Sequence, residues 1–374
     1  MPPIRSTRRT RAGTAVVLVL ALSSPLTAPP AGAARSEAIV FARSGGRRGL
    51  YSISPQGTNL KRLTHRRDSS PVWSPDGSRI VFNRWQESKR RYLLFVARAD
   101  GSHARRVDGD TSGWPSVWSP DGTHVAYESY TSRTWVVVVV ELATGTKSVI
   151  EGATSPAWSP EGDRIAFSAP RSDHPECGSE VFTAAPDGSD REQVTDDAFA
   201  DDSVPVWSPD GRRIAFVSSR DHDHARDPEE CEAVAGDHLA AEIYVTPAGG
   251  GAALRLTKGF TRKHTPAWSP DGSRVAYVAS CSIDYCDDRG YPHDTEVFVV
   301  RADGAGRRKK LTDTWRWAEQ GPVWSPDGSA IVYGARNNGD ARIETVDVRS
   351  LERTLLVDSR ALDFHPHWRP GATG

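Results

Sequence analysis

PVWSPDGSRIVF, at Pro71–Phe82, is the first of seven closely similar phrases in this chain. The others are SVWSPDGTHVAY (Ser116–Tyr127), PAWSPEGDRIAF (Pro156–Phe167), PVWSPDGRRIAF (Pro205–Phe216), PAWSPDGSRVAY (Pro266–Tyr277), PVWSPDGSAIVY (Pro322–Tyr333) and the shorter PHWRPG (Pro366–Gly371). Ser-Pro-Asp-Gly suits a tight turn, because Pro presets φ at the second position and Gly takes the positive φ that follows. The apolar residues on either side predict one short strand before the turn and a second after it.

Each phrase is followed by a third apolar strand, such as Leu93–Ala97, and by a second turn, such as Ala-Asp-Gly at 99–101. A fourth short piece resembling Leu-Thr closes the unit, as at Leu311–Thr312. Successive phrase tryptophans lie 40 to 61 residues apart. A strand-rich unit repeated at this spacing is typical of a β-propeller, with one four-stranded antiparallel blade per unit.

The two ends of the chain each supply part of a unit. The N-terminal part contains three candidate strands, Ile39–Phe41, Leu50–Ile53 and Lys61–Thr64, and the C-terminal part contains the missing opening strand, Phe364–Trp368. We therefore predict an all-β, seven-bladed propeller whose N- and C-terminal strands share one blade, which removes free sheet edges. Six blades is the alternative, because the first and last phrases are the weakest.

The repeat, with its later Asp-Gly and Leu-Thr, resembles the TolB-type WD-like (PD-type) propeller repeat over roughly Glu37 to Gly371. The resemblance implies a periplasmic protein that binds a peptidoglycan-associated lipoprotein and also carries an N-terminal α/β domain. There is no room for that domain between the leader and the first strand, so that specific role is not expected here. The same repeat forms the propeller of prolyl-oligopeptidase-like peptidases, but the sequence has no Gly-x-Ser-x-Gly nucleophile elbow.

The N-terminus reads as a secretory signal peptide over residues 1–33, followed by a single propeller domain over residues 34–374. Arginines at positions 5, 8, 9 and 11 precede an apolar run, Ala12–Leu22, and Ala31-Gly32-Ala33 provides a cleavage site. The apolar run is too short for a permanent membrane span. Arg8-Arg9 leaves twin-arginine export open beside the general secretory route.

Charge and hydropathy argue against two properties of this chain, general nucleic-acid binding and a membrane span after the leader. The whole-chain charge of −1 includes four leader arginines and no leader acid, so the remaining chain carries −5, which argues against general nucleic-acid binding. No later segment is long and apolar enough to span a membrane. We expect a monomeric bacterial protein, secreted or periplasmic, whose partner is an envelope or extracellular protein or polysaccharide.

Three long insertions interrupt the loops between second and third strands of blades four, five and six, at Ser168–Ser179, Ser218–Ala241 and Ala279–Thr295. All four cysteines lie in them: Cys177, Cys231, Cys281 and Cys286. In an exported protein they indicate two disulfides with three possible pairings, of which we favour Cys281–Cys286 and Cys177–Cys231. A metal-thiolate site is the alternative, although the spacing lacks a second zinc-type pair.

The insertions are also rich in Asp, Glu and His. The candidate metal ligands are Asp221, His222, Asp223 and His224, which could hold calcium or another divalent cation. The alternative is that these polar loops are simply solvated. No other cofactor is predicted.

Residues that precede the phrase tryptophans are predicted to surround the central channel. The candidate ligand-binding residues of this rim are Asp202, His264, Trp315, Trp317, Gln320 and His365. Tryptophan can stack on a sugar or peptide while the polar groups fix its orientation. The alternative is structural: the tryptophans cover a blade edge and the histidines satisfy backbone groups.

These features favour a binding module for an envelope or extracellular protein or polysaccharide, because no nucleophile with its base is recognisable. No catalytic residue is therefore assigned. The alternative is an extracytoplasmic propeller enzyme, a polysaccharide lyase or a hydrolase, with a metal and histidine site on the loop-rich face. A purely structural role is the third possibility.

Overall fold

The computed structural model describes residues 38–131, 133–171, 178–197, 200–221, 241–259, 263–280, 295–314, 317–337, 339–359 and 363–371. Throughout these ranges the regular structure consists of β-strands. The described residues include no helix with the length and hydropathy needed to cross a membrane. The chain divides into two units, Met1–Ala34 and Arg35–Gly374, and all of the described residues belong to the second.

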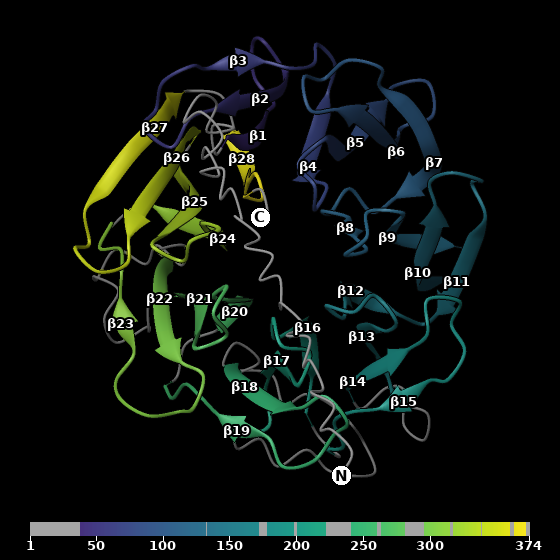
Figure 1. The fold of residues 1–374 in the computed structure, drawn as a ribbon, viewed down its shortest axis with the longest axis vertical. Coiled ribbons are helices and arrows are strands. Elements are labelled where there is room, and N and C mark those ends of the chain that lie inside the picture. Colours follow the sequence, from purple (N-terminus) through teal and green to yellow (C-terminus); the bar gives the residue numbers. More distant parts are fainter. Residues whose placement is uncertain are drawn as a thin grey trace, which may run out of the picture. The chain divides into compact units, whose positions relative to one another are not determined.

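Runs of four antiparallel strands recur along the chain, so the strands fall into four classes (Figure 1). The first strands, which lie nearest the centre of the unit, are β28 (Asp363–Trp368), β4 (Asp68–Trp73), β8 (Val117–Trp118), β12 (Thr154–Trp158), β16 (Asp202–Trp207), β20 (Lys263–Trp268) and β24 (Ala318–Trp324). The second strands are β1 (Ile39–Arg43), β5 (Arg79–Gln86), β9 (His124–Thr131), β13 (Ile165–Pro170), β17 (Arg213–Ser218), β21 (Arg274–Ser280) and β25 (Ala330–Asn337).

The third and fourth strands form the outer half of each run (Figure 1). The third strands are β2 (Gly49–Ile53), β6 (Arg91–Arg98), β10 (Thr134–Glu141), β14 (Ser179–Ala184), β18 (Glu242–Pro247), β22 (Thr295–Arg301) and β26 (Asp340–Asp347). The fourth strands are β3 (Lys61–Arg62), β7 (Arg105–Thr111), β11 (Lys147–Glu151), β15 (Glu192–Gln193), β19 (Leu254–Arg255), β23 (Lys309–Lys310) and β27 (Arg353–Ser359).

Five of the runs form separate four-stranded sheets, and the last two join into one eight-stranded sheet. The join is a single parallel residue pair, Thr295 with Ala318, between β22 and β24. The sheet that begins the chain has the order β28-β1-β2-β3, because the C-terminal β28 pairs antiparallel with β1. The four-strand repeats expected from the sequence are therefore present, and both ends of the chain contribute to one sheet.

Strand direction defines two faces of this unit. Because neighbouring strands are antiparallel, the Ser-Pro-Asp-Gly turns between first and second strands lie on one face, which we call the turn face. Connections between second and third strands, and those from one run to the next, lie on the opposite face, which we call the connection face. The described residues that flank the three sequence insertions lie at the connection face.

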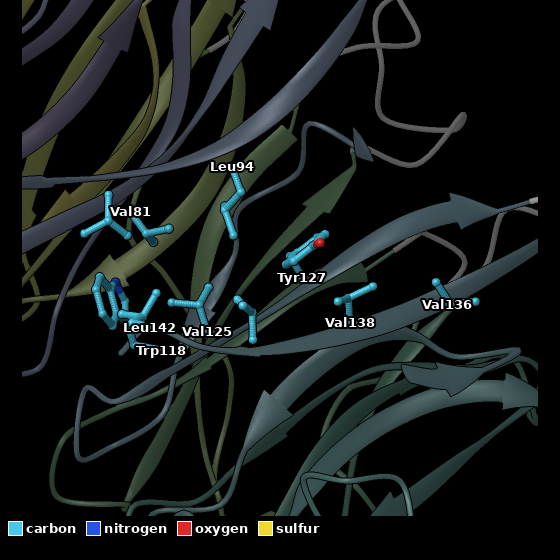
Figure 2. Packing of buried hydrophobic residues seen from close by; sticks show 10 residues of the cluster. Val81, Leu94, Trp118, Val125, Tyr127, Val136, Val138 and Leu142 are labelled. Atoms are coloured by element: carbon cyan, nitrogen blue, oxygen red, sulfur yellow. The ribbon is translucent and has the colours of Figure 1, made fainter. Parts of the chain in front are cut away.

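Neighbouring runs pack through apolar clusters, one at each contact between them. One such cluster joins Val81 and Leu94 of the β4–β7 sheet to Trp118, Val125 and Tyr127 of the next sheet (Figure 2). Others include a cluster that joins Phe41 to Val332 and one that joins Val40 to Ile80. Successive side chains of a second strand point toward opposite neighbours, as Ile80 and Val81 do, so both sides of the strand are buried.

A tryptophan and an arginine fasten one sheet to the next. The Trp118 indole donates a hydrogen bond to the Val72 carbonyl of the preceding sheet at 3.1 Å. The Arg79 guanidinium carbon lies 5.0 Å from the centre of the Trp118 ring, and Arg79 Nη2 donates to the Gly122 carbonyl at 2.7 Å. Stacking and a charge-assisted hydrogen bond therefore act together at this contact.

The arginine half of this latch recurs where the ends of the chain meet the β4–β7 sheet, although the Trp73 indole N–H has no hydrogen-bond partner among the described residues. Arg369, directly after the last phrase tryptophan, lies 5.2 Å from the Trp73 ring centre. Its Nη2 and Nε donate to the Gly77 carbonyl at 2.7 and 3.0 Å. Arg79 comes after a complete Ser-Pro-Asp-Gly turn, whereas Arg369 lies within the shortened phrase Trp-Arg-Pro-Gly.

The first strands carry a recurrent bulge. In β4 the register shifts between Ser69 and Val72, and Ser70, the residue before proline, has a φ of 52°. Equivalent residues in five of the other six first strands, with φ of 52–56°, are Ser155, Val204, Thr265, Gly321 and His365. Positive φ is unfavourable for β-branched residues such as Val204, so the surrounding packing must hold this conformation.

Buried ionisable residues occupy one position in four of the first strands, five residues before the tryptophan. They are Asp68, Asp202, Lys263 and Glu319. Asp68 accepts two hydrogen bonds from Arg84 at 2.6 and 2.9 Å, and Lys263 Nζ lies 3.0 Å from a Glu242 oxygen. Buried charges need such partners because desolvation is costly.

Glu319 has the weakest partnership of this set. Thr314 donates to one of its carboxyl oxygens, and the other oxygen has no hydrogen-bond partner within the described ranges. Burial raises the pKa of Glu319 to about 9; the Thr314 hydrogen bond opposes this shift, and the charge of Glu296 adds to it. Glu319 is therefore protonated at neutral pH.

We expect Glu319→Gln to become more stable relative to the native chain as pH rises from 5 to 8. The pKa of Glu319 in the folded protein lies above the ordinary value of 4.5. The native chain therefore keeps its full free energy of unfolding below pH 4.5, and this free energy falls as the pH rises toward about 9. Across this interval the difference in unfolding free energy should change by roughly 1–3 kcal/mol in favour of Gln. Urea unfolding at the two pH values measures it, with exposed Glu352→Gln as control. A difference that does not change with pH would contradict the assignment.

Arg369→Ala should lower the free energy of unfolding by about 1–3 kcal/mol, because it removes ring stacking and a charge-assisted hydrogen bond at once. Chemical denaturation of the purified full chain gives this quantity. Arg349→Ala, which removes an exposed arginine, is the matched control and should change it little. Equal stability of both variants and the native chain would show that the contact between Arg369 and Gly77 contributes nothing.

Candidate functional site

The predicted rim residues fall on three different positions of the first strands. Asp202 lies five residues before its tryptophan, His264 and Gln320 lie four before theirs, and His365 lies three before Trp368. Asp202 begins β16 ahead of the bulge, whereas His365 is itself the positive-φ residue of β28. The side chains therefore do not form one equivalent ring.

Asp202 belongs to an internal ion pair. Its Oδ2 accepts a hydrogen bond from Arg220 Nη2 at 2.5 Å, and its side chain is fully buried. The Arg220 guanidinium also lies 4.9 Å from the centre of the Tyr244 ring. Burial raises the pKa of Asp202 to about 7, and the positive charge of Arg220 opposes the shift. This geometry anchors the start of β16.

The other predicted residues on this side are partly covered. His264 and Gln320 are half-buried. Trp317 packs against an apolar cluster, and the Arg342 guanidinium lies 4.0 Å from the centre of its ring. These contacts match the structural alternative for Trp317, in which the ring covers a blade edge. Trp315 lies outside the described residues.

His365 takes part in a cluster that also contains Ser70, Gly113 and Trp114, which we call the Trp114–His365 cluster. The Ser70 hydroxyl donates to the Gly113 carbonyl at 2.8 Å and lies 3.1 Å from His365 Nδ1. The Trp114 and His365 rings meet edge to face with 6.4 Å between centroids. Three separate segments of the chain therefore converge here: β4, β28 and the connection between β7 and β8.

Trp114 is the exposed member of the cluster. Its side chain is 61% exposed, although Asn83 Nδ2 donates to its backbone carbonyl at 2.8 Å and fixes the main chain. A large aromatic ring held on rigid backbone and left open to solvent is typical of a recognition site. Nothing in the sequence pairs Trp114 with His365, because the two are far apart in the chain.

His365 is uncharged near neutral pH. Burial lowers its pKa to about 4, and the positive charge of Arg336 adds to the shift. A neutral imidazole has one donor and one acceptor nitrogen, and Ser70 already engages Nδ1. The cluster thus combines an exposed indole face with neutral hydrogen-bonding groups, which suits a polar, uncharged portion of a ligand.

The predicted metal ligands are only partly covered by the structure. Asp221 is described: the Tyr244 hydroxyl donates to its Oδ2, and Arg255 Nη1 donates to the same oxygen at 2.8 Å. His222, Asp223 and His224 lie outside the described residues, as do Cys177, Cys231, Cys281 and Cys286. Within the described part of the chain, no three His, Cys, Asp or Glu side chains are grouped to hold a metal ion.

Comparison with known proteins gives consistent results. Residues 83–224 match the family model described as the TolB beta propeller domain. The Tol-Pal system protein TolB of Chromobacterium violaceum is 38% identical over 65 residues, which cover 17% of this chain and 15% of the relative. The matches to the first curated relatives span between 12% and 47% of those proteins, so less than half of each is represented.

Solved structures extend the likeness of fold over most of the chain. TolB from Acinetobacter baumannii aligns with a TM-score of 0.53 and 20% identity, covering 89% of this chain and 82% of that one. Oligogalacturonate lyase from Vibrio parahaemolyticus aligns with a TM-score of 0.57 and 12% identity, covering 86% and 85%. At these identities the likeness concerns the fold alone. The repeated phrases, the four-strand runs and these matches agree that the chain is similar to TolB-type β-propeller repeat proteins.

Proposed function

We propose that this protein is an exported seven-bladed propeller that acts as a binding module in the cell envelope, and that recognition occurs on its connection face. The partner is an envelope or extracellular protein or polysaccharide. The observation that carries the proposal is the Trp114–His365 cluster, in which an exposed indole lies beside neutral hydrogen-bonding groups on fixed backbone.

Seven blades and a closed ring are part of this proposal. The strand order supports them, since the eight-stranded sheet contains two runs of four and β28 pairs with β1. Apolar clusters support closure as well, because one joins the terminal sheet to β24–β27 and another joins it to β4–β7. The Arg369 latch on Gly77 adds a polar contact at the second of these.

Export rests on the leader at residues 1–33, and an envelope location rests on that leader together with the similarity to TolB proteins of the Tol-Pal system. In this compartment the four cysteines would form disulfides. A rigid scaffold with pre-ordered loops loses less conformational entropy when it binds, so this face suits recognition.

The second candidate function is a polysaccharide-cleaving enzyme of the extracytoplasmic space. The likeness of fold to oligogalacturonate lyase favours it, and so does the concentration of His and Asp between Asp221 and His224. A divalent cation held by this segment would be required, and Asp221, already bound to Tyr244 and Arg255, would have to exchange partners.

A binding experiment tests the proposal directly. The purified mature protein is immobilised and exposed to a solubilised envelope fraction of the organism that encodes it. Trp114→Ala should lower the capture of the components that the native chain retains by about tenfold, the effect of losing a central aromatic anchor. Leu60→Ala, which removes an exposed side chain near the turn face, is the control and should leave capture unchanged.

Two results would contradict the binding proposal. One is equal capture by the native chain and by Trp114→Ala, with both proteins folded according to their melting transitions. The other is cleavage of a uronate polymer by the purified native protein that is abolished by a chelator, which would favour the enzyme.

A further inference from the structure

The connection face carries a second group of aromatic residues on two neighbouring hairpins, half-buried on the first hairpin and exposed on the second. In hairpin β5–β6, Trp85 and Tyr92 are cross-strand partners whose rings meet edge to face at 5.0 Å. In hairpin β9–β10, Tyr130 and Trp135 are cross-strand partners in the same arrangement at 5.3 Å. Tyr130 is 60% exposed and Trp135 is 40% exposed. The hairpins belong to adjacent sheets, drawn in blue and teal (Figure 1).

The end of β7 connects the two hairpins into one surface. On one side, Asp110 forms an ion pair with Arg91 of β6. On the other side, the Ser112 N–H donates to the Glu128 carbonyl of β9 at 2.9 Å. Gly113 follows, so close to Tyr92 that a Cβ added there would lie 2.9 Å from the ring. The aromatic pairs are therefore held in fixed relation to each other and border the Trp114–His365 cluster.

Exposed basic residues surround these rings. They lie in the connection before β4 and in the two hairpin turns: Arg66, Arg67, Lys89, Arg90 and Arg133. Glu87 is the one acid in the segments 65–67, 87–90 and 131–134 of the sequence, and it lies 3.7 Å from Arg67. The Arg67 guanidinium also lies 4.8 Å from the centre of the Trp85 ring. A net positive surface thus occurs in a chain whose charge without its leader is negative.

We infer that this hairpin surface, formed by the two aromatic pairs and the five basic residues, binds an anionic polysaccharide of the polyuronate class. Pyranose rings present C–H faces that pack on indole and phenol rings, and carboxylates pair with guanidinium and ammonium groups. Opposite charges at a partly exposed surface attract the polymer and fix its register. The inference rests on the proposed binding function and names a ligand class for the same face.

The chemistry distinguishes this ligand from two others. A polyanion without sugar rings would use the basic residues but gain nothing from Tyr130 and Trp135. A neutral glucan would stack on the rings but would gain nothing from the basic residues. A charged sugar polymer engages both sets of side chains. A single-stranded nucleic acid could also do so, but the negative charge of the chain without its leader argues against nucleic-acid binding.

Polygalacturonate is the probe, and its fully methyl-esterified form is the matched neutral ligand. We expect the full chain to bind polygalacturonate more tightly than the ester, and the affinity to fall with added salt because exposed charges are screened. Poly-glutamate and a single-stranded oligothymidylate serve as polyanions without uronate rings. Equal affinity for either of these and for polygalacturonate would overturn the inference.

Two sets of substitutions test the residues. Lys89→Gln, Arg90→Gln and Arg133→Gln together remove three charges, and Tyr130→Thr with Trp135→Thr removes one ring pair while keeping strand propensity. Each set should weaken polygalacturonate binding about tenfold, with melting temperatures close to that of the native chain. The control, Lys61→Gln with Arg307→Gln and Arg349→Gln, removes three exposed charges elsewhere and should bind within about twofold of the native chain.

Failure of this inference differs from failure of the proposed function. If the control loses as much affinity as the hairpin variants, the effect is one of net charge and the hairpin surface is not the site. If the hairpin variants bind polygalacturonate normally while Trp114→Ala still loses its envelope component, the proposed binding function stands and the polyuronate assignment is wrong.

Discussion

The contact between each phrase tryptophan and the preceding sheet is the constraint on which the rest of this structure depends. Trp118, Trp268, Trp324 and Trp368 each donate an indole hydrogen bond of 3.0–3.1 Å to a backbone carbonyl of the preceding first strand. A short sheet cannot bury its apolar side alone, so its position is set by such contacts with its neighbours. The repeated Trp-Ser-Pro-Asp-Gly phrase therefore encodes packing between sheets as well as a turn.

The exceptions show how much variation this contact allows. In the described part of the chain the indole N–H groups of Trp73, Trp158 and Trp207 have no hydrogen-bond partner. Arg164 turns toward Thr183 and Glu192 of its own run. At position 161 Glu replaces the turn aspartate, and Asp163 accepts the Ser159 hydroxyl hydrogen bond instead, at 2.7 Å. The frame thus tolerates the loss of single polar contacts because the apolar clusters between sheets remain.

The rigid frame leaves the connection face free to vary. Bulges in the first strands place residues such as Ser70 and His365 in conformations that regular strands do not adopt, and the two meet Trp114 from a third segment. Outside this cluster, the elongated β7 fixes two hairpins side by side. The connection face therefore presents an exposed indole with neutral hydrogen-bonding groups in the Trp114–His365 cluster. The neighbouring hairpin surface presents aromatic rings with positive charges.

Much of the fold was predictable, because turn residues at fixed offsets and alternating apolar strands are local signals. The four-strand runs and the pairing of Phe364–Trp368 with the first strand of the chain followed from counting them. The site was predictable only in part. His365 was selected, but Asp202 could not be recognised as the partner of Arg220, since the sequence does not show which side of a first strand is covered.

The aromatic pairs were missed for a related reason. Trp85 and Tyr92 are separated by a turn whose length fixes the register, and only that register shows that they are cross-strand partners. The same holds for Tyr130 and Trp135. The cysteine pairings and the cation site stay predictions, because nearly all of their residues lie outside the described ranges.

Hydrogen–deuterium exchange of the full chain, with and without saturating acidic oligogalacturonide, tests the central claim that recognition belongs to the connection face. The account predicts slower exchange in the Asp110–Trp114 segment and in the turns of hairpins β5–β6 and β9–β10, with no change in the Ser-Pro-Asp-Gly turns. Protection confined to those turns, or no protection anywhere at a concentration that saturates binding, would contradict it.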